Sequence, residues 1–251
     1  MQGRITMPPS LQGRAQQAKS QKPDRFRNLY GMRTADLLRD CWRAIKKHAA
    51  YGVDRVRAQE YAPNLEDNSR HLVERLKHKR SRATLVRRHS RPHGGGKVRP
   101  LGRPVVEETR VQLAVTRLHT AIDAQDVRRC RSGYRPQVGA RDAVDTWTIT
   151  RQCGRDNWGV DADITGCFDH LDHEWILRMF AERIDDRALR RLSKKWRKAG
   201  GSTQTAQGDI RRREARTGER LHPSSRMSLG TMRSSCGVSK WSNGTVTAKR
   251  A

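Results

Sequence analysis

The sequence predicts an α+β fold, and three kinds of pattern predict it. Apolar residues recur at helical spacing in several stretches, and they alternate at strand spacing over residues 160–164. Residues 82–104 combine basic residues, prolines and a glycine turn in the manner of a β-hairpin. The chain has 251 residues, enough for one large domain or two small ones.

The charge of the chain is strongly unbalanced. Lys and Arg number 53 against 26 Asp and Glu, a formal net charge of +27 at pH 7. Such a fold repels itself unless a polyanion neutralises it, so nucleic acid is the expected partner and an anionic membrane surface is the competing one. The sequence has no apolar run near the ~20 residues of a spanning helix and no evident signal peptide. We therefore expect no membrane insertion and a cytoplasmic location.

The five cysteines are scattered along the chain without a CxxC pair. This distribution argues against a zinc site and against a disulfide framework. We expect reduced thiols and no disulfides.

Several stretches are predicted to be helical. The first covers residues 36–50, with Thr34 as its N-cap. The others are centred on residues 65–76, 107–125, 142–147, 174–182 and 187–198. Asp185 and Asp186, between the last two, are interpreted as a helix boundary and not as a metal site. Residues 1–28 are polar and basic, which predicts a flexible arm.

The predicted hairpin at residues 82–104 turns at residues 94–96, three consecutive glycines. It lacks the spacing of a P-loop. Lys97 and Arg99 follow the turn, where a point charge and a guanidinium fork can hold the oxygens of a triphosphate. The alternative is a solvated basic hairpin that touches a nucleic acid backbone, with Arg87 and Arg88 among its contacts.

A short strand is predicted to present carboxylates. Val160, Ala162 and Ile164 alternate with Asp161 and Asp163, and Gly166 then breaks the pattern. Hard cations such as Mg²⁺ prefer oxygen ligands, often one or two carboxylates together with substrate phosphates. Asp163 is thus either a metal ligand or an ordinary polar residue at a strand end.

Three segments, in the expected order, resemble motifs of group II intron reverse transcriptases. They are GKVRPLGRP (residues 96–104), SGYRPQVGARDAVD (residues 132–145) and DADITGCFDHLDHEW (residues 161–175). The resemblance implies a partial right-hand polymerase, with a fingers-like region over residues 29–157 and the first part of a palm over residues 158–200. It also implies RNA as a partner, either intron RNA or a template.

The same resemblance implies roles for individual residues. Asp163 would be the catalytic, Mg²⁺-binding aspartate. Phe168 would exclude the 2′-hydroxyl of the incoming nucleotide, with a plain core aromatic as the alternative. Lys97 and Arg99 would contact the triphosphate of a deoxynucleotide, and Arg135 would contact a phosphate or brace its turn.

The hairpin departs from the family pattern at three positions. Arg91, His93 and Arg103 stand where the family usually carries an apolar residue, a Lys and an Ile. Charged residues at these positions are expected to cost core packing and to weaken the hairpin.

The resemblance ends near Gly200. Residues 201–251 are basic and polar without a helical or strand period, which predicts a disordered tail. No YxDD motif is present. We therefore expect a truncated or frameshifted, inactive reverse transcriptase homologue that retains RNA binding. The alternatives are a non-catalytic RNA-binding or maturase-like module and a decayed gene product.

Overall fold

The computed structural model describes residues 9–20, 25–32, 34–93, 97–123, 132, 138–154, 158–163, 173–199, 201–204, 210–213 and 245–250. The chain forms two compact units, each discontinuous in sequence. One comprises residues 23–118 and 171–226, and the other comprises residues 1–22, 119–170 and 227–251. The contiguous fingers-like and palm segments expected from the sequence do not coincide with these units, and their boundaries stay a prediction.

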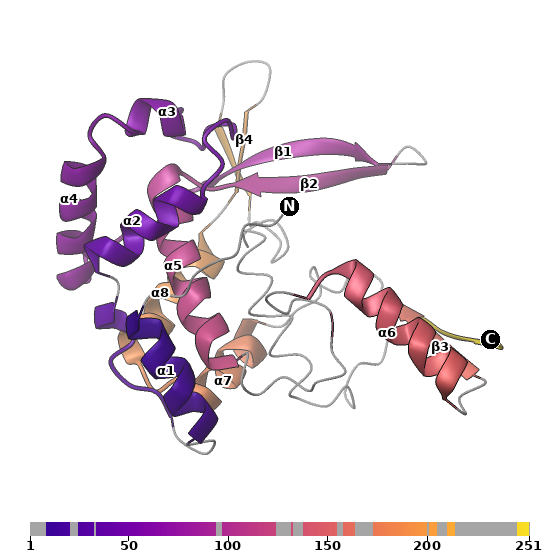
Figure 1. Ribbon diagram of the computed structural model, residues 1–251. Helices are drawn as coiled ribbons and strands as arrows, with labels where there is room; N and C mark the ends of the chain where they lie inside the picture. The colour runs from indigo at the N-terminus through magenta and orange to yellow at the C-terminus, as the bar shows by residue number, and fades with distance from the viewer. Residues whose placement is uncertain are drawn as a thin grey trace. The chain divides into compact units, whose positions relative to one another are not determined.

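The larger unit combines helices with a small sheet (Figure 1). Its helical elements are the 3₁₀ turn η1 (Tyr30–Met32), α2 (Ala35–Ala44), α3 (Ala58–Tyr61), α4 (Leu65–Lys77), most of α5 (Val106–Asp123), α7 (His173–Arg183) and α8 (Arg187–Lys198). The buried residues lie at the apolar positions of these helices, among them Leu38, Cys41, Leu72, Leu76, Val111, Val115, Leu118, Leu189 and Leu192. Together with the sheets, these helices agree with the α+β prediction.

The sheet of this unit is built on the predicted hairpin. Strands β1 (Val86–His93) and β2 (Lys97–Arg103) pair antiparallel. Strand β4 (Gly201–Gln204) pairs parallel with β1, and β5 (Ile210–Arg213) pairs antiparallel with β4. The strand order is β2-β1-β4-β5, so two strands from the region predicted to be a disordered tail extend the hairpin. Strand β6 (Thr245–Arg250), in the smaller unit, also falls in that region, so the predicted disorder is wrong for these three strands. For residues 205–209, 214–244 and 251 the prediction concerns residues outside the described part.

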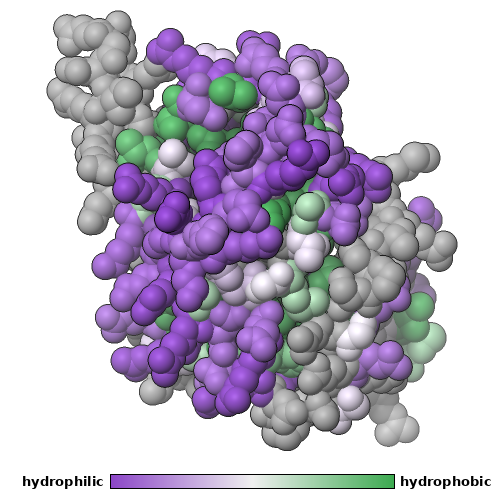
Figure 2. All heavy atoms as spheres, turned by 90° about the vertical axis from the view of Figure 1, so that its left-hand side faces the viewer, coloured by the Kyte–Doolittle hydropathy of each residue, from purple (hydrophilic) through white to green (hydrophobic). Residues whose placement is uncertain are grey.

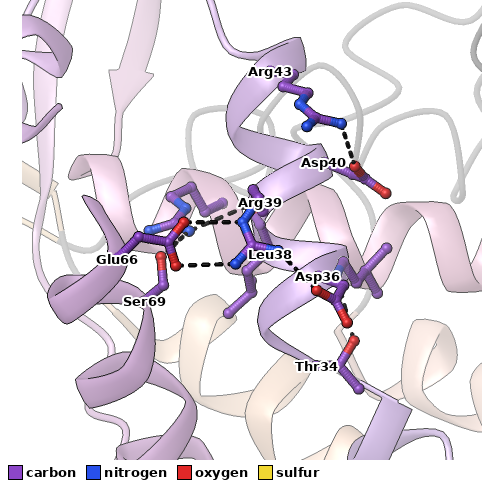
Figure 3. Close-up of polar contacts among 10 residues, drawn as sticks. Thr34, Asp36, Leu38, Arg39, Asp40, Arg43, Glu66 and Ser69 are labelled. Atoms are coloured by element: carbon purple, nitrogen blue, oxygen red, sulfur yellow. Dashed lines mark hydrogen bonds and ion pairs between the residues drawn. The ribbon is translucent and has the colours of Figure 1, made fainter.

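Helices α2 and α4 are joined by charged side chains (Figure 3). Arg39 of α2 donates to both carboxylate oxygens of Glu66 on α4, at 2.9 and 3.0 Å, and also donates to Asp36 at 2.8 Å. A guanidinium that holds one carboxylate with two parallel hydrogen bonds fixes orientation as well as distance. Hydrophilic residues predominate on the side where α3 and α4 lie (Figure 2).

Helix α2 begins as predicted and ends earlier than predicted. Thr34 is its N-cap, and the Thr34 hydroxyl accepts a hydrogen bond from the Leu37 N–H. The expected helix over residues 36–50 stops at Ala44. The Lys47 ammonium lies 3.5 Å from the centre of the Trp42 ring and donates to the Trp42 carbonyl, an acceptor that a continuing helix would have used.

The boundary predicted at Asp185 and Asp186 is confirmed. The Asp186 carboxylate accepts hydrogen bonds from the N–H groups of Ala188 and Leu189, both at 3.0 Å, and so caps α8. It also accepts one from the Tyr30 N–H at 2.6 Å, which ties the segment before α2 to the start of α8. Phe26 and Ile184, both buried, form an isolated β-bridge beside this contact.

The smaller unit contains α1 (Pro9–Ser20), α6 (Ala140–Cys153), β3 (Trp158–Asp163) and β6 (Thr245–Arg250). Strands β3 and β6 pair antiparallel over their whole length. Helix α1 lies within the segment for which the sequence predicted a flexible arm. Its Gln, Ala, Arg and Lys residues favour a helix, and Leu11 provides a buried apolar contact that the composition alone did not reveal.

No helix in the described part of the chain is long and apolar enough to cross a membrane. Two cysteines lie in the described part of the chain, and both are free thiols. Cys41 is buried and Cys153 is exposed. Burial raises the pKa of the Cys41 thiol to about 11, so this thiol stays protonated at neutral pH.

Candidate nucleic-acid interface

The register of the β1–β2 hairpin places basic residues opposite one another. Residues directly opposite in an antiparallel pair lie on the same face of the sheet. One face therefore carries the pairs Arg87 with Arg103, His89 with Leu101, Arg91 with Arg99 and His93 with Lys97. We call these eight residues the basic face of the hairpin.

The basic face lacks internal compensation for its charge. Arg87 and Arg103 are half-buried and Arg91 is exposed. None of these three forms an ion pair with a carboxylate in the described part of the chain. Like charges directly opposite in a sheet destabilise it, and a bound polyanion removes the repulsion. The exposure of Arg91 also explains why a charged residue is tolerated where packing was expected to suffer.

Arg87 is held in place by an aromatic ring. Its guanidinium carbon lies 4.3 Å from the centre of the Tyr51 ring, and that of Arg57 lies 5.9 Å from the same ring. Tyr51 belongs to the loop after α2, and its neighbour Gly52 is buried. A Cβ atom at Gly52 would lie 2.8 Å from the Cα of Val105, so this loop lies directly against the chain that leaves the hairpin. The base of the hairpin is thereby fixed to the helical body.

The opposite face of the hairpin begins with Val86, which is buried, and continues with Arg88, which is half-buried. Arg87 and Arg88 were both predicted to contact nucleic acid. The structure places them on opposite faces, so only Arg87 belongs to the basic face. Lys97 and Arg99 lie on β2, and their side chains are outside the described part.

The remaining predicted site residues lie elsewhere. Asp163 is the last residue of β3, opposite Thr245 of β6, and belongs to the smaller unit. Phe168 and Arg135 lie outside the described residues. The predicted site residues are thus divided between the two compact units, and the larger unit holds Arg87, Arg88, Lys97 and Arg99.

A metal centre finds no support in the described part of the chain, where no three His, Cys, Asp or Glu side chains are grouped to hold an ion. Asp163 would supply a single carboxylate. Two metal ions held ~4 Å apart, as in nucleotidyl transfer, need more carboxylates than this one.

Sequence reasoning missed Arg110, which is completely buried on α5. Its guanidinium donates to the Tyr61 hydroxyl at 3.1 Å, to the Leu38 carbonyl at 3.2 Å and to the Ser69 hydroxyl at 2.7 Å. These acceptors belong to α3, α2 and α4. One buried cation therefore joins four helices. An arginine among apolar residues gives no sequence signal of such a role, because its partners come from distant segments.

The Tyr61 hydroxyl connects this cation to the surface. Glu107 lies 3.4 Å from the hydroxyl and also pairs with Arg75 of α4. Burial, together with the charge of Glu107, raises the pKa of Tyr61 to about 12. The phenol therefore stays protonated and can donate to Glu107 while it accepts from Arg110.

Comparison with known proteins finds relatives over part of the chain. No family model matches it. Four curated proteins do, and over the aligned part the chain is a homologue of group II intron-encoded proteins. The resemblance that its motifs indicated is thereby confirmed.

The individual relatives are as follows. The group II intron-encoded protein LtrA of Lactococcus lactis subsp. cremoris is 35% identical over 104 residues, 41% of this chain and 17% of LtrA. Protein YkfC of Escherichia coli (strain K12) is 30% identical over 112 residues, 43% of this chain and 29% of YkfC. A putative COX1/OXI3 intron 1 protein of Saccharomyces cerevisiae is 24% identical over 110 residues, 44% of this chain and 13% of that protein. The matched part is therefore less than a third of each relative.

Proposed function

We propose that this chain is an RNA-binding homologue of group II intron reverse transcriptases, and that it contacts the RNA backbone through the basic face of the hairpin. The observation that carries the proposal is that like charges lie directly opposite one another in the strand register, in a chain homologous to intron-encoded proteins. Phosphates supply the missing negative charge, and their contacts release counterions. The proposed partner is intron RNA or a template, and the proposed location is the cytoplasm.

The fingers and palm of a right-hand polymerase are the proposed setting, over residues 29–157 and 158–200. In that setting Asp163 would hold a divalent cation such as Mg²⁺, which supplies charge neutralisation during nucleotidyl transfer. Lys97 and Arg99 would bind the triphosphate of a deoxynucleotide. Phe168 would exclude a ribonucleotide, because a ring against the 2′ position leaves no room for the hydroxyl.

We further propose that the 251-residue chain does not extend a primer on its own. The sequence has no YxDD motif, so it lacks the second set of carboxylates that two-metal transfer requires. This observation favours a non-catalytic RNA-binding or maturase-like role over polymerisation by this chain. A primer-extension assay on an RNA template with Mg²⁺ or Mn²⁺ should give no product. Measurable extension would contradict this part of the proposal.

A salt titration tests the RNA contact. The affinity of the wild-type chain for RNA should fall linearly on a plot of log K against log salt concentration. The double substitution Arg91→Gln and Arg99→Gln should lower the magnitude of that slope by about 2, roughly one for each lost phosphate contact.

The matched control is Arg43→Gln with Arg70→Gln. Both arginines are exposed and already paired, with Asp40 and Asp67, at 3.2 Å in each case. This control removes the same charge and should leave the slope near that of the wild type. A salt-independent affinity of the wild-type chain would refute the proposal, as would equal slopes for the two double variants.

A further inference from the structure

Helix α8 carries a line of basic residues that no predicted motif used. Arg187, Arg191, Lys194 and Lys198 recur at i, i+4, i+7 and i+11, so they lie on one face of the helix. All four are exposed, and α8 contains no acidic residue. We call these four residues the α8 stripe. From Arg187 to Lys198 it spans about 16 Å along the helix axis, at ~1.5 Å per residue.

The α8 stripe differs from the other basic helix surfaces of the same unit. On α2 and α4, exposed basic residues pair with an acid three residues earlier: Arg43 with Asp40, Arg70 with Asp67 and Lys77 with Glu74. No residue of the stripe has an ion-pair partner in the described part of the chain. On α8, Arg190 pairs with Asp185, and the charge left uncompensated is that of the α8 stripe.

The stripe is presented by a firmly packed helix. Leu189, Leu192 and Ser193 are buried on the other side of α8, and Asp186 caps its first turn. Lys195 donates to the Ser81 carbonyl at 2.9 Å, shortly before β1 begins. Because the backbone of α8 is already ordered, RNA binding to the stripe costs little backbone entropy, and only the exposed side chains need to be immobilised.

The same contacts connect the stripe to the hairpin. After Lys198, the chain enters β4, where Gly201 and Ser202 pair with Val86 and Arg87 of β1. The C-terminal end of α8 therefore lies beside the base of the hairpin that carries the basic face. Both basic surfaces belong to the same compact unit.

We propose that the α8 stripe is a second RNA contact, which binds the phosphate backbone separately from the hairpin. This inference rests on the proposed function, because the polyanion it names is the RNA bound by the basic face. Charge complementarity supports it: four uncompensated cations in a straight row match the evenly spaced charges of a nucleic acid strand. Such contacts position the RNA and do not read its sequence.

The test compares two triple variants of the full chain. One replaces Arg187, Arg191 and Lys194 with Gln. The control replaces Arg43, Arg70 and Lys77 with Gln. It also removes two arginines and one lysine, but from α2 and α4, where each of the three is ion-paired. The net charge is identical in the two variants. The stripe variant should lower the magnitude of the log K against log salt slope by about 2 to 3, and the affinity near 0.15 M salt by about tenfold or more. The control should change each far less.

A chemical footprint tests the same surface without substitution. RNA bound to the wild-type chain should protect Lys194 and Lys198 from acetylation, as measured by mass spectrometry, and should leave Lys77 as reactive as in the free chain. The inference would be overturned if the two triple variants had equal slopes of log K against log salt, or if RNA did not protect Lys194 and Lys198.

Two outcomes separate the possible failures. If the wild-type chain shows no salt-dependent RNA binding, the proposed function fails, and this inference fails with it. If the hairpin variant lowers the slope while the stripe variant matches its control, the proposed function stands and the α8 contact is refuted. Loss of binding to phosphatidylserine vesicles in the stripe variant, with RNA binding unchanged, would also refute the RNA contact.

Discussion

The guanidinium of Arg110 on α5 donates a hydrogen bond of 2.7 Å to the hydroxyl of Ser69 on α4, and both residues are buried. The Ser69 hydroxyl accepts this hydrogen bond and in turn donates one to the Leu65 carbonyl in the preceding turn of α4. A buried cation is tolerated when its donors find acceptors, and here the acceptors of the two terminal amino groups are neutral groups on three other helices. Arg110 therefore fixes the helical body from which the basic hairpin projects.

Replacing Arg110 should destabilise the larger unit. Arg110→Lys keeps the charge but cannot reach Tyr61, Leu38 and Ser69 together, since one ammonium replaces a planar fork. We expect the free energy of unfolding to fall by about 2 to 4 kcal/mol, measured by urea denaturation. Arg117→Lys is the control, because within the described residues this arginine has a single hydrogen bond, a long one of 3.4 Å to the Asp40 carbonyl. Equal stability of the wild type and Arg110→Lys would show that the network is dispensable.

The loop at Gly52 should reject a methyl group. A Cβ atom there would lie 2.8 Å from the Cα and 2.9 Å from the N of Val105, which are backbone atoms that cannot rotate away. Gly52→Ala should therefore cost about 1 to 3 kcal/mol of stability. Gly31→Ala, where nothing lies within 4 Å, should be nearly neutral. Thermal unfolding of the two variants provides the comparison, and similar midpoints would contradict the close packing seen here.

The Asp186 cap of α8 should contribute more to the free energy of unfolding than the neighbouring ion pairs of Asp185. Asp186→Ala leaves three N–H groups without their acceptor, those of Tyr30, Ala188 and Leu189. We expect a loss of about 1 to 2 kcal/mol in urea denaturation. Asp185→Ala removes partly exposed ion pairs with Arg27 and Arg190, and it should change stability by less than about 0.5 kcal/mol. A larger loss from Asp185→Ala than from Asp186→Ala would reverse this assignment.

His119 should make stability depend on pH. The residue is buried on α5, and burial lowers the pKa of its imidazole to about 3. In the unfolded chain the imidazole binds a proton near pH 6.5. The folded state does not bind one until about pH 3, so protons favour unfolding between these values. Above about pH 6.5 the neutral imidazole of His119 therefore makes its full contribution to the free energy of unfolding. That contribution is lost progressively as the pH falls toward 3.

His119→Gln removes this titration and provides the measurement. The difference in unfolding free energy between wild type and variant should shift against the wild type by about 1.4 kcal/mol per pH unit below 6.5. Urea titrations at pH 7.5, 6.0 and 5.0 would show the trend. The other titrating groups are shared by both proteins and cancel in the difference. A difference that stays constant over this range would mean that His119 is accessible to protons in the folded state.

The elements that were predicted best from the sequence are those that local sequence patterns determine. The bounds of α8 follow from a local apolar period between Asp186 and Ala199, and the structure gives Arg187–Lys198. The hairpin follows from strand-forming residues on either side of a glycine turn. Its basic face follows from the alternation of residues along a strand once the pairing is known.

Other features were decided only by tertiary structure. Arg110 is an ordinary basic residue in the sequence of a long helix, and its burial depends on acceptors brought by three separate segments. The ring of Tyr51 lies under Arg87 because Gly52 allows its loop to approach Val105. Helix α2 ends before its apolar period does, and its Trp42 carbonyl accepts from the Ile45 N–H and from the Lys47 ammonium.

The sequence by itself determined that this chain is strongly basic, that its fold mixes helices with a small sheet, and that its motifs resemble those of group II intron proteins. The tertiary structure decided which charges are compensated. Arg43, Arg70 and Lys77 are each paired with an acid, whereas the residues of the α8 stripe and Arg87, Arg91 and Arg103 of the hairpin have no ion-pair partner in the described part of the chain. Charge pairing depends on distances of a few ångströms, and for residues on different elements only the packing of the chain sets those distances.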